Sequence, residues 1–118
     1  MKRLIPFLTA LLLIPAIALA APMTVEERVD TELAIYNEAL DLSDTQAEAI
    51  RKGLTDKLTV GREAYEIKKA GDEAKGKELN QAAGKKFYNV LKSELSKEQF
   101  NTYKMKKAEI KEAIKNSR

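Results

Sequence analysis

Apolar residues recur along this chain at intervals of three and four, the spacing that places side chains on one face of an α-helix. After Pro22, no run alternates apolar and polar residues in the manner of a β-strand, and no further proline interrupts the chain. Ala, Glu, Lys, Leu and Gln, which favour helices, dominate this part of the sequence. The pattern predicts one all-α domain of four helices over residues 21–118.

The expected helices are separated by recognisable breaks. The second runs from Ser43 to about Ala70, Gly71-Asp72 breaks the chain, and the third spans about Glu73 to Glu94. The expected inward-facing residues are Val25, Val29, Leu33, Tyr36 and Leu40 in the first helix, Ile50, Leu54, Leu58 and Tyr65 in the second, Leu79, Ala83, Phe87, Val90 and Leu91 in the third, and Phe100, Tyr103, Ile110 and Ile114 in the fourth. Lys107 interrupts the apolar stripe of the fourth helix. At 1.5 Å per residue the second helix is about 40 Å long, which favours an elongated shape.

Three of the helix starts carry a capping box, in which a Ser or Thr caps the helix and a Glu or Gln three residues later bonds back to it. The pairs are Thr24 with Glu27, Ser43 with Gln46, and Ser96 with Gln99.

The N-terminal segment has the three parts of a secretory signal peptide. Lys2 and Arg3 supply positive charge, Leu4 to Leu19 is apolar except for Thr9, and Ala18-Leu19-Ala20 offers small residues for cleavage. The run is shorter than the roughly 20 residues of a spanning helix and contains two prolines. We therefore predict residues 1–20 to be a signal peptide cleaved after Ala20, which leaves an exported, periplasmic domain without stable membrane insertion.

Charge is distributed unevenly over the expected mature chain. Residues 21–67 hold 5 basic and 11 acidic side chains, a net charge of −6, whereas residues 68–118 hold 14 and 7, a net charge of +7. Such asymmetry is compatible with self-association, with a basic face for an acidic partner, or with two ordinary solvated faces. Few large apolar residues are available to cover four long helices, and small domains of this kind often gain stability by oligomerising. A homodimer is expected.

The residue types argue against an enzyme. The chain contains neither cysteine nor histidine, which removes the usual soft-metal ligands, the commonest general base and disulfides. Gly71 to Lys77 has the glycine and lysine spacing of a phosphate-binding loop, but Glu78 stands where a Ser or Thr is required and no strand precedes it. We expect no catalytic residues, no metal site and no cofactor.

Lysines interleaved with aromatic and apolar residues follow the third and fourth helices. A surface of this composition can bind flexible, partly apolar, acidic chains, because charge steers the encounter and apolar contacts retain it. An ordinary solvated helix face is the alternative for each lysine. Nucleic acid is disfavoured as a partner by the near-neutral mature chain, which has a net charge of +1. The candidate client-binding residues are Lys77, Lys85, Tyr88, Lys92, Lys104, Met105 and Lys111.

Two segments resemble the Leu-Thr-x-x-Gln motif that occurs twice in the Spy/CpxP family of periplasmic stress proteins. They are Leu42-Ser43-x-x-Gln46 and Leu95-Ser96-x-x-Gln99. Serine replaces threonine in both, a mild change because either residue can cap a helix. The likeness covers most of the expected mature chain, although that chain is short for the family and lacks the histidine-rich tails found in some relatives.

The resemblance implies antiparallel helical hairpins that form a curved, cradle-like dimer. It also implies an ATP-independent chaperone, or holdase, that binds unfolded or partly folded proteins through mixed basic and apolar contacts. The alternative is an accessory or inhibitory protein that binds the sensor domain of an envelope-stress histidine kinase. The motif residues themselves are expected to determine the fold.

Overall fold

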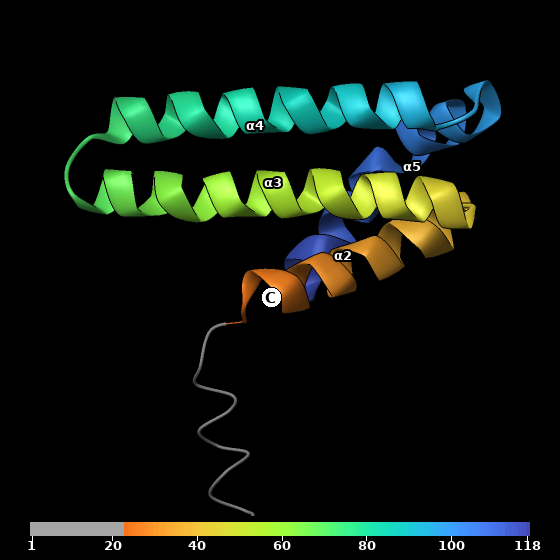
Figure 1. Ribbon diagram of the computed structural model, residues 1–118, viewed down its shortest axis with the longest axis horizontal. Coiled ribbons are helices and arrows are strands. Elements are labelled where there is room, and N and C mark those ends of the chain that lie inside the picture. Colours follow the sequence, from red (N-terminus) through yellow and green to blue (C-terminus); the bar gives the residue numbers. More distant parts are fainter. Residues whose placement is uncertain (1–22) are drawn as a thin grey trace, which may run out of the picture.

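The computed structural model describes residues 23–118, and these form four α-helices without strands (Figure 1). The helices are α2 (Val25–Leu40), α3 (Asp44–Lys69), α4 (Glu73–Glu94) and α5 (Lys97–Asn116). The all-α prediction with four helices is confirmed. The predicted signal peptide, residues 1–20, lies outside the described residues. Within residues 23–118, no helix is both long enough and apolar enough to cross a membrane.

The expected capping boxes start α2, α3 and α5. At each of them the Ser or Thr side chain accepts a hydrogen bond from the backbone N–H three residues later, and the Glu or Gln side chain accepts one from the backbone N–H of the cap. The Ser43 and Ser96 hydroxyls accept at 3.2 and 3.1 Å. These bonds satisfy donors that every helix leaves unpaired at its start, which is why the helices begin where the sequence indicates.

Two residues with positive φ end helices. Asp41 (φ 54°) follows α2, and its backbone N–H donates to Asn37 O at 2.8 Å. Gly71 (φ 111°) forms the turn between α3 and α4, where the left-handed backbone favours a residue without a side chain.

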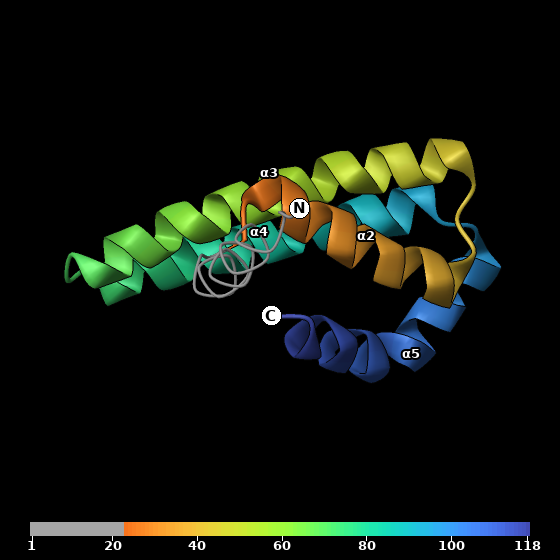
Figure 2. The ribbon, with the colours of Figure 1, turned by 90° about the horizontal axis from the view of Figure 1, so that it is seen from below.

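The helices are not packed equally against one another. α3 and α4 lie side by side, while α2 packs against both α3 and α5 (Figures 1 and 2). The ends of α3 and α4 that meet at Gly71 extend beyond α2 and α5 in both views. This part of the molecule therefore consists of two helices that bury residues mainly against each other.

The core lies where the four helices converge. Ile50, Leu54 and Leu91 have no exposed surface, and burial of each such side chain contributes roughly 1.5–3 kcal/mol. The rings of Tyr36 and Phe87 meet edge to face, with centroids 5.6 Å apart. The buried cluster comprises Val29, Tyr36, Leu40, Ile50, Leu54, Phe87, Leu91, Leu95, Tyr103 and Ile110.

Two glycines mark points where α3 and α4 approach each other closely. A Cβ atom on Gly76 would lie 2.8 Å from the Ala64 carbonyl oxygen and 2.4 Å from Lys68 Cγ. A Cβ atom on Gly53 would lie 3.1 Å from the Phe87 ring. Gly76 is thus explained by helix contact, and the glycine and lysine segment from Gly71 to Lys77 is a helix junction.

One inward-facing prediction is wrong. Tyr65 is 62% exposed, although it follows Leu58 at a helical interval of seven. Ala64, which has no exposed surface, is instead the buried residue at this level of α3. Ala64 faces α4, where its carbonyl oxygen would lie 2.8 Å from a Cβ atom on Gly76, and the neighbouring Tyr65 therefore points away from this contact.

Candidate functional site

The two motif glutamines form one hydrogen-bonded unit. Gln46 Nε2 donates to Gln99 Oε1 at 2.7 Å, and Gln99 Nε2 donates to Gln46 Oε1 at 3.0 Å. The same Oε1 atoms also accept the backbone N–H groups of Ser43 and Ser96, at 3.0 and 2.9 Å. The two capping boxes are therefore connected directly.

Each motif glutamine also bonds to the end of the helix that precedes the other motif. Gln46 Nε2 donates to the Glu94 carbonyl at 2.9 Å, at the end of α4. Gln99 Nε2 donates to the carbonyls of Leu40 and Asp41, at 3.2 and 3.3 Å, at the end of α2. The two junctions, between α2 and α3 and between α4 and α5, are therefore held together by reciprocal glutamine hydrogen bonds.

The motif leucines complete this junction from the apolar side. Leu95 is 7% exposed and belongs to the buried cluster, while Leu42 is partly buried and packs against that cluster. The six motif residues thus lie together at the junctions of α2 with α3 and of α4 with α5. Beside them, the four helices surround a groove.

The groove, which we call the basic groove, has a volume of about 430 Å³ and receives residues from all four helices. Its apolar lining consists of Leu58, Phe87, Ile110 and Ile114. Its charged lining consists of the carboxylate of Glu32 and the cations Lys57, Lys107, Lys111, Lys115 and Arg118. Tyr36, Tyr88 and Tyr103 also line it.

Positive charge in the basic groove is not balanced by the protein. Among residues 23–118, none of its five cations has an ion-pair partner within 4.0 Å. Glu32 is 3% exposed, and its nearest cation is Arg28, at 3.8 Å. Burial lowers the pKa of Lys57, and the positive charges of Arg118 and Lys111 lower it further, while Glu32 opposes them. The groove is therefore a region of positive potential.

Two buried tyrosines line the groove, and their hydroxyls have no hydrogen-bond partner among residues 23–118. Tyr36 is 5% exposed and Tyr103 is 7% exposed, and no hydrogen bond joins either hydroxyl to another group within the described part of the chain. Burial raises the pKa of both phenols, and the proximity of Tyr103 and Glu32 adds to the increase at Tyr36. Both hydroxyls are thus protonated donors at neutral pH.

Of the seven predicted client-binding residues, four lie in the basic groove or elsewhere on α5. Tyr88 and Lys111 line the basic groove. Lys104 lies with its Nζ 5.3 Å from the centre of the Phe100 ring, which also contacts Tyr88, and Met105 is 85% exposed.

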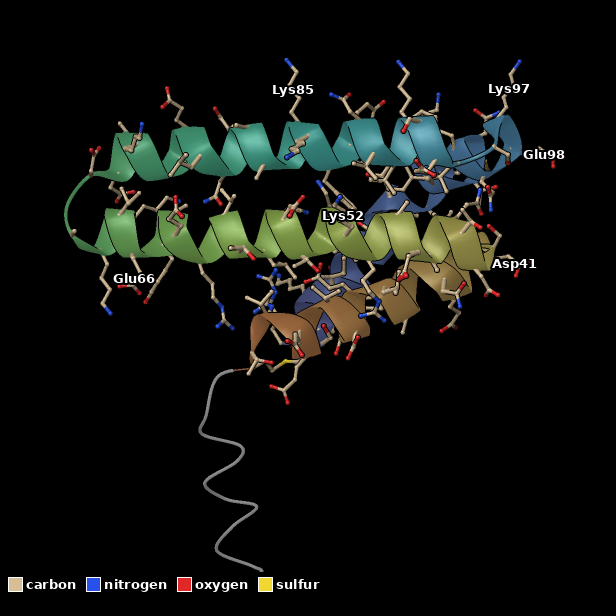
Figure 3. All side chains as sticks on the ribbon, in the orientation of Figure 1. Asp41, Lys52, Glu66, Lys85, Lys97 and Glu98 are labelled. Carbon is tan, nitrogen blue, oxygen red and sulfur yellow. The ribbon has the colours of Figure 1, made fainter. Side chains whose placement is uncertain are left out.

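The other predicted residues lie elsewhere. Lys77, Lys85 and Lys92 are exposed on α4 and do not line the groove, and Figure 3 shows Lys85 pointing away from α3. The structure therefore does not bring all seven residues to one surface.

Sequence reasoning missed several residues of the groove. Tyr36 was assigned only to the core, although it lines the groove as well. Lys57 lies over the Phe87 ring at 5.2 Å, between two inward-facing leucines of α3. Lys107 carried a usable signal, because a lysine that interrupts an apolar stripe faces the interior side of its helix.

A second hollow adjoins the basic groove and shares Lys57, Leu58 and Arg118 with it. It has a volume of about 850 Å³ and adds Arg28 and Arg62 to the cations of this side of the molecule. Arg62 donates a hydrogen bond to the Met23 carbonyl. The positive region therefore continues from α5 along α3.

Within residues 23–118, no three Asp or Glu side chains gather closely enough to bind a metal ion. Comparisons of the chain with protein-family models, with curated proteins and with solved structures found no match. Similarity to the Spy/CpxP family stays a prediction based on the two motifs.

Proposed function

We propose that this protein is an exported, periplasmic, ATP-independent holdase that binds unfolded or partly folded proteins. The observation that supports this proposal is the basic groove, in which five cations without ion-pair partners surround an open apolar and aromatic surface. Such a surface attracts acidic segments from a distance and retains apolar ones on contact.

The irregular composition of unfolded chains suits this surface. A groove open to water leaves the backbone of a bound segment hydrated, so no single register or sequence is required. Exposed side chains beside it, among them Met105 and Lys104, supply further adaptable contacts. Binding by many weak contacts is reversible, and a holdase of this kind needs no nucleotide.

The proposal includes the expected assembly of antiparallel helical hairpins in a cradle-like homodimer. Its support is the short turn between α3 and α4, together with the ends of these helices that extend beyond the rest of the molecule (Figure 1). The opposite net charges of residues 21–67 and 68–118 favour association in which unlike halves meet. Sedimentation equilibrium at two salt concentrations tests this, since a monomer at low salt would contradict it.

The function is tested by light scattering during the aggregation of two unrelated denatured proteins, without ATP. The holdase proposal predicts that near-stoichiometric amounts of the folded protein slow the aggregation of both. Protection of neither client would contradict it and would favour the alternative of an accessory protein with one defined partner, such as the sensor domain of an envelope-stress kinase.

A further inference from the structure

The floor of the basic groove has a chemical property that client binding does not require. Tyr36 and Tyr103 are 5% and 7% exposed as whole residues and line the groove, and their hydroxyls have no hydrogen-bond partner within residues 23–118. Unpaired buried donors are costly, so polar groups at this depth generally have a partner, whether protein, water or ligand. The position of both hydroxyls in the groove indicates where such a partner binds.

The groups around these hydroxyls define the chemistry of the partner. The lysines and Arg118 of the groove donate hydrogen bonds and cannot accept them. The five cationic side chains outnumber the single carboxylate side chain, Glu32, which already lies near Arg28. The site therefore favours a ligand with oxygen acceptors and negative charge.

The apolar lining adds a second requirement. Leu58 and Ile114 are partly buried side chains that line the groove and pack against the buried cluster to which Phe87 and Ile110 belong. A volume of about 430 Å³ falls within the range of small-molecule sites, about 300–1,000 Å³. A small inorganic anion would leave most of this apolar surface uncovered.

We propose that the basic groove binds an anionic single-chain amphiphile, a molecule with a carboxylate headgroup and one alkyl chain. The carboxylate accepts hydrogen bonds from the tyrosine hydroxyls and from the surrounding lysines, and the alkyl chain covers the apolar lining. This binding is independent of the holdase proposal, and neither requires the other.

Around the buried Tyr36 and Tyr103, hydrogen-bond balance favours an amphiphile over a peptide, while the open part of the same groove leaves the backbone of a client chain hydrated. A peptide carries a backbone N–H donor at nearly every residue, and a buried N–H group needs an acceptor. Most helical backbone carbonyls are used within the helices, and Glu32 is the only carboxylate side chain that lines the groove. A fatty carboxylate brings acceptors and apolar carbon only, so it leaves no donor unpaired.

The test is calorimetric titration of the full chain, purified as the cell processes it, with dodecanoate below its micelle concentration. We expect saturable binding of one dodecanoate per chain. We also expect dodecyltrimethylammonium, which has the same alkyl chain and the opposite charge, to bind at least about tenfold more weakly because it meets five cations. Acetate, which lacks the chain, should not bind measurably.

Variants locate the site. Lys107→Glu with Lys111→Glu should weaken dodecanoate binding by about tenfold or more, since two attractive charges become repulsive. The double variant Tyr36→Phe with Tyr103→Phe removes the two hydroxyls without changing the charge of the groove. It should also weaken dodecanoate binding. Lys77→Glu with Lys85→Glu makes the same charge change on exposed α4 positions outside the groove and should leave the affinity unchanged.

Four results would overturn the proposal. These are the absence of saturable dodecanoate binding, equal binding of the cationic amphiphile, wild-type affinity in both groove variants, and binding of an acidic peptide in the groove when dodecanoate does not bind. All variants share the N-terminal segment of the wild-type chain, so their differences report on the groove. Because aggregation assays do not enter this test, failure here is distinct from failure of the holdase proposal.

Discussion

The side-chain amides of Gln46 and Gln99 hydrogen-bond to each other in both directions, at 2.7 and 3.0 Å, although 53 residues separate them in the chain. Each glutamine also caps its own helix and bonds to the end of the helix before the other motif. One pair of side chains therefore couples the local start of two helices to the global arrangement of all four.

We predict that Gln46→Ala and Gln99→Ala each lower the free energy of unfolding by about 1–3 kcal/mol, because each leaves partly buried groups without a partner. The double variant should show a coupling energy of about 0.5–3 kcal/mol in urea denaturation. Gln81→Ala, on an exposed part of α4, is the control and should change stability by less than about 0.5 kcal/mol. Strict additivity of the two motif variants would show that the amides do not act as a pair.

The close approach of α3 and α4 makes two glycines respond oppositely to the same substitution. Gly76→Ala should destabilise the protein by about 1–3 kcal/mol, because the added methyl group meets the Ala64 carbonyl and Lys68. Gly84→Ala should stabilise it by about 0.5–1 kcal/mol, because a Cβ atom there meets nothing within 4 Å and alanine favours the helix. Thermal melts of both variants test this, and equal effects at both positions would contradict the α3–α4 contact.

The motif leucines should tolerate a charge to different degrees. Leu95→Asp should unfold the domain, because a carboxylate cannot ionise in a position that is 7% exposed without a partner. Leu42→Asp should be milder, since Leu42 is only partly buried at the edge of the core. Helical circular dichroism and melting measure both, and a native melt for Leu95→Asp would contradict the described core.

Tyr36→Phe should keep or increase stability at neutral pH. The Tyr36 hydroxyl has no hydrogen-bond partner among the described residues, so removing it relieves a desolvation cost of about 1–3 kcal/mol. Where water or a ligand bonds to the hydroxyl, its removal leaves stability unchanged. Urea denaturation of the ligand-free protein measures this. A loss of more than about 1 kcal/mol would show that the hydroxyl has a protein partner.

The same substitution should change the pH dependence of stability. Burial raises the pKa of Tyr36 above the ordinary value of 10.0, so the phenol of the folded chain stays protonated while that of the unfolded chain ionises. Relative to high pH, the contribution of Tyr36 to the free energy of unfolding is fully present below pH 10. It is lost as pH rises toward the folded-state pKa, with a slope of at most about 1.4 kcal/mol per pH unit.

The lowered pKa of Lys57 has the opposite effect, a gain of stability as pH rises toward 10.5. This gain is the same in wild type and in Tyr36→Phe, so it cancels in the comparison of the two. Denaturation of wild type and Tyr36→Phe at several pH values above 9 should therefore show the steeper loss in wild type. Parallel curves would contradict burial of the phenol.

The start of each helix could be predicted because capping is local. Ser43 and Gln46 lie three residues apart, and the same is true of Ser96 and Gln99, so adjacent sequence contains the whole signal. The all-α composition likewise required no tertiary information. What the sequence did not indicate is the bonding of one capping box to the other, since nothing in either motif specifies a partner 53 residues away.

The residues that line the basic groove could be identified from the sequence only in part, and the reason is physical. Lysines were grouped by their spacing along single helices, whereas the groove is formed by residues from all four. Lys111 and Tyr88 lie in the groove, but Lys85 is on the far side of α4 (Figure 3). Tyr65 was placed inward because its helical period is right, although the residue that α3 buries at that level is the neighbouring Ala64.

The most direct test of the account compares two charge-matched variants in the aggregation assay. Lys107→Glu with Lys111→Glu alters the basic groove, and Lys77→Glu with Lys85→Glu makes the same change on the outer side of α4. With both variants folded by circular dichroism, the account predicts that the groove variant loses most of its protection of two unrelated clients while the α4 variant retains it. Equal protection by wild type and the groove variant would contradict the groove as the client-binding surface.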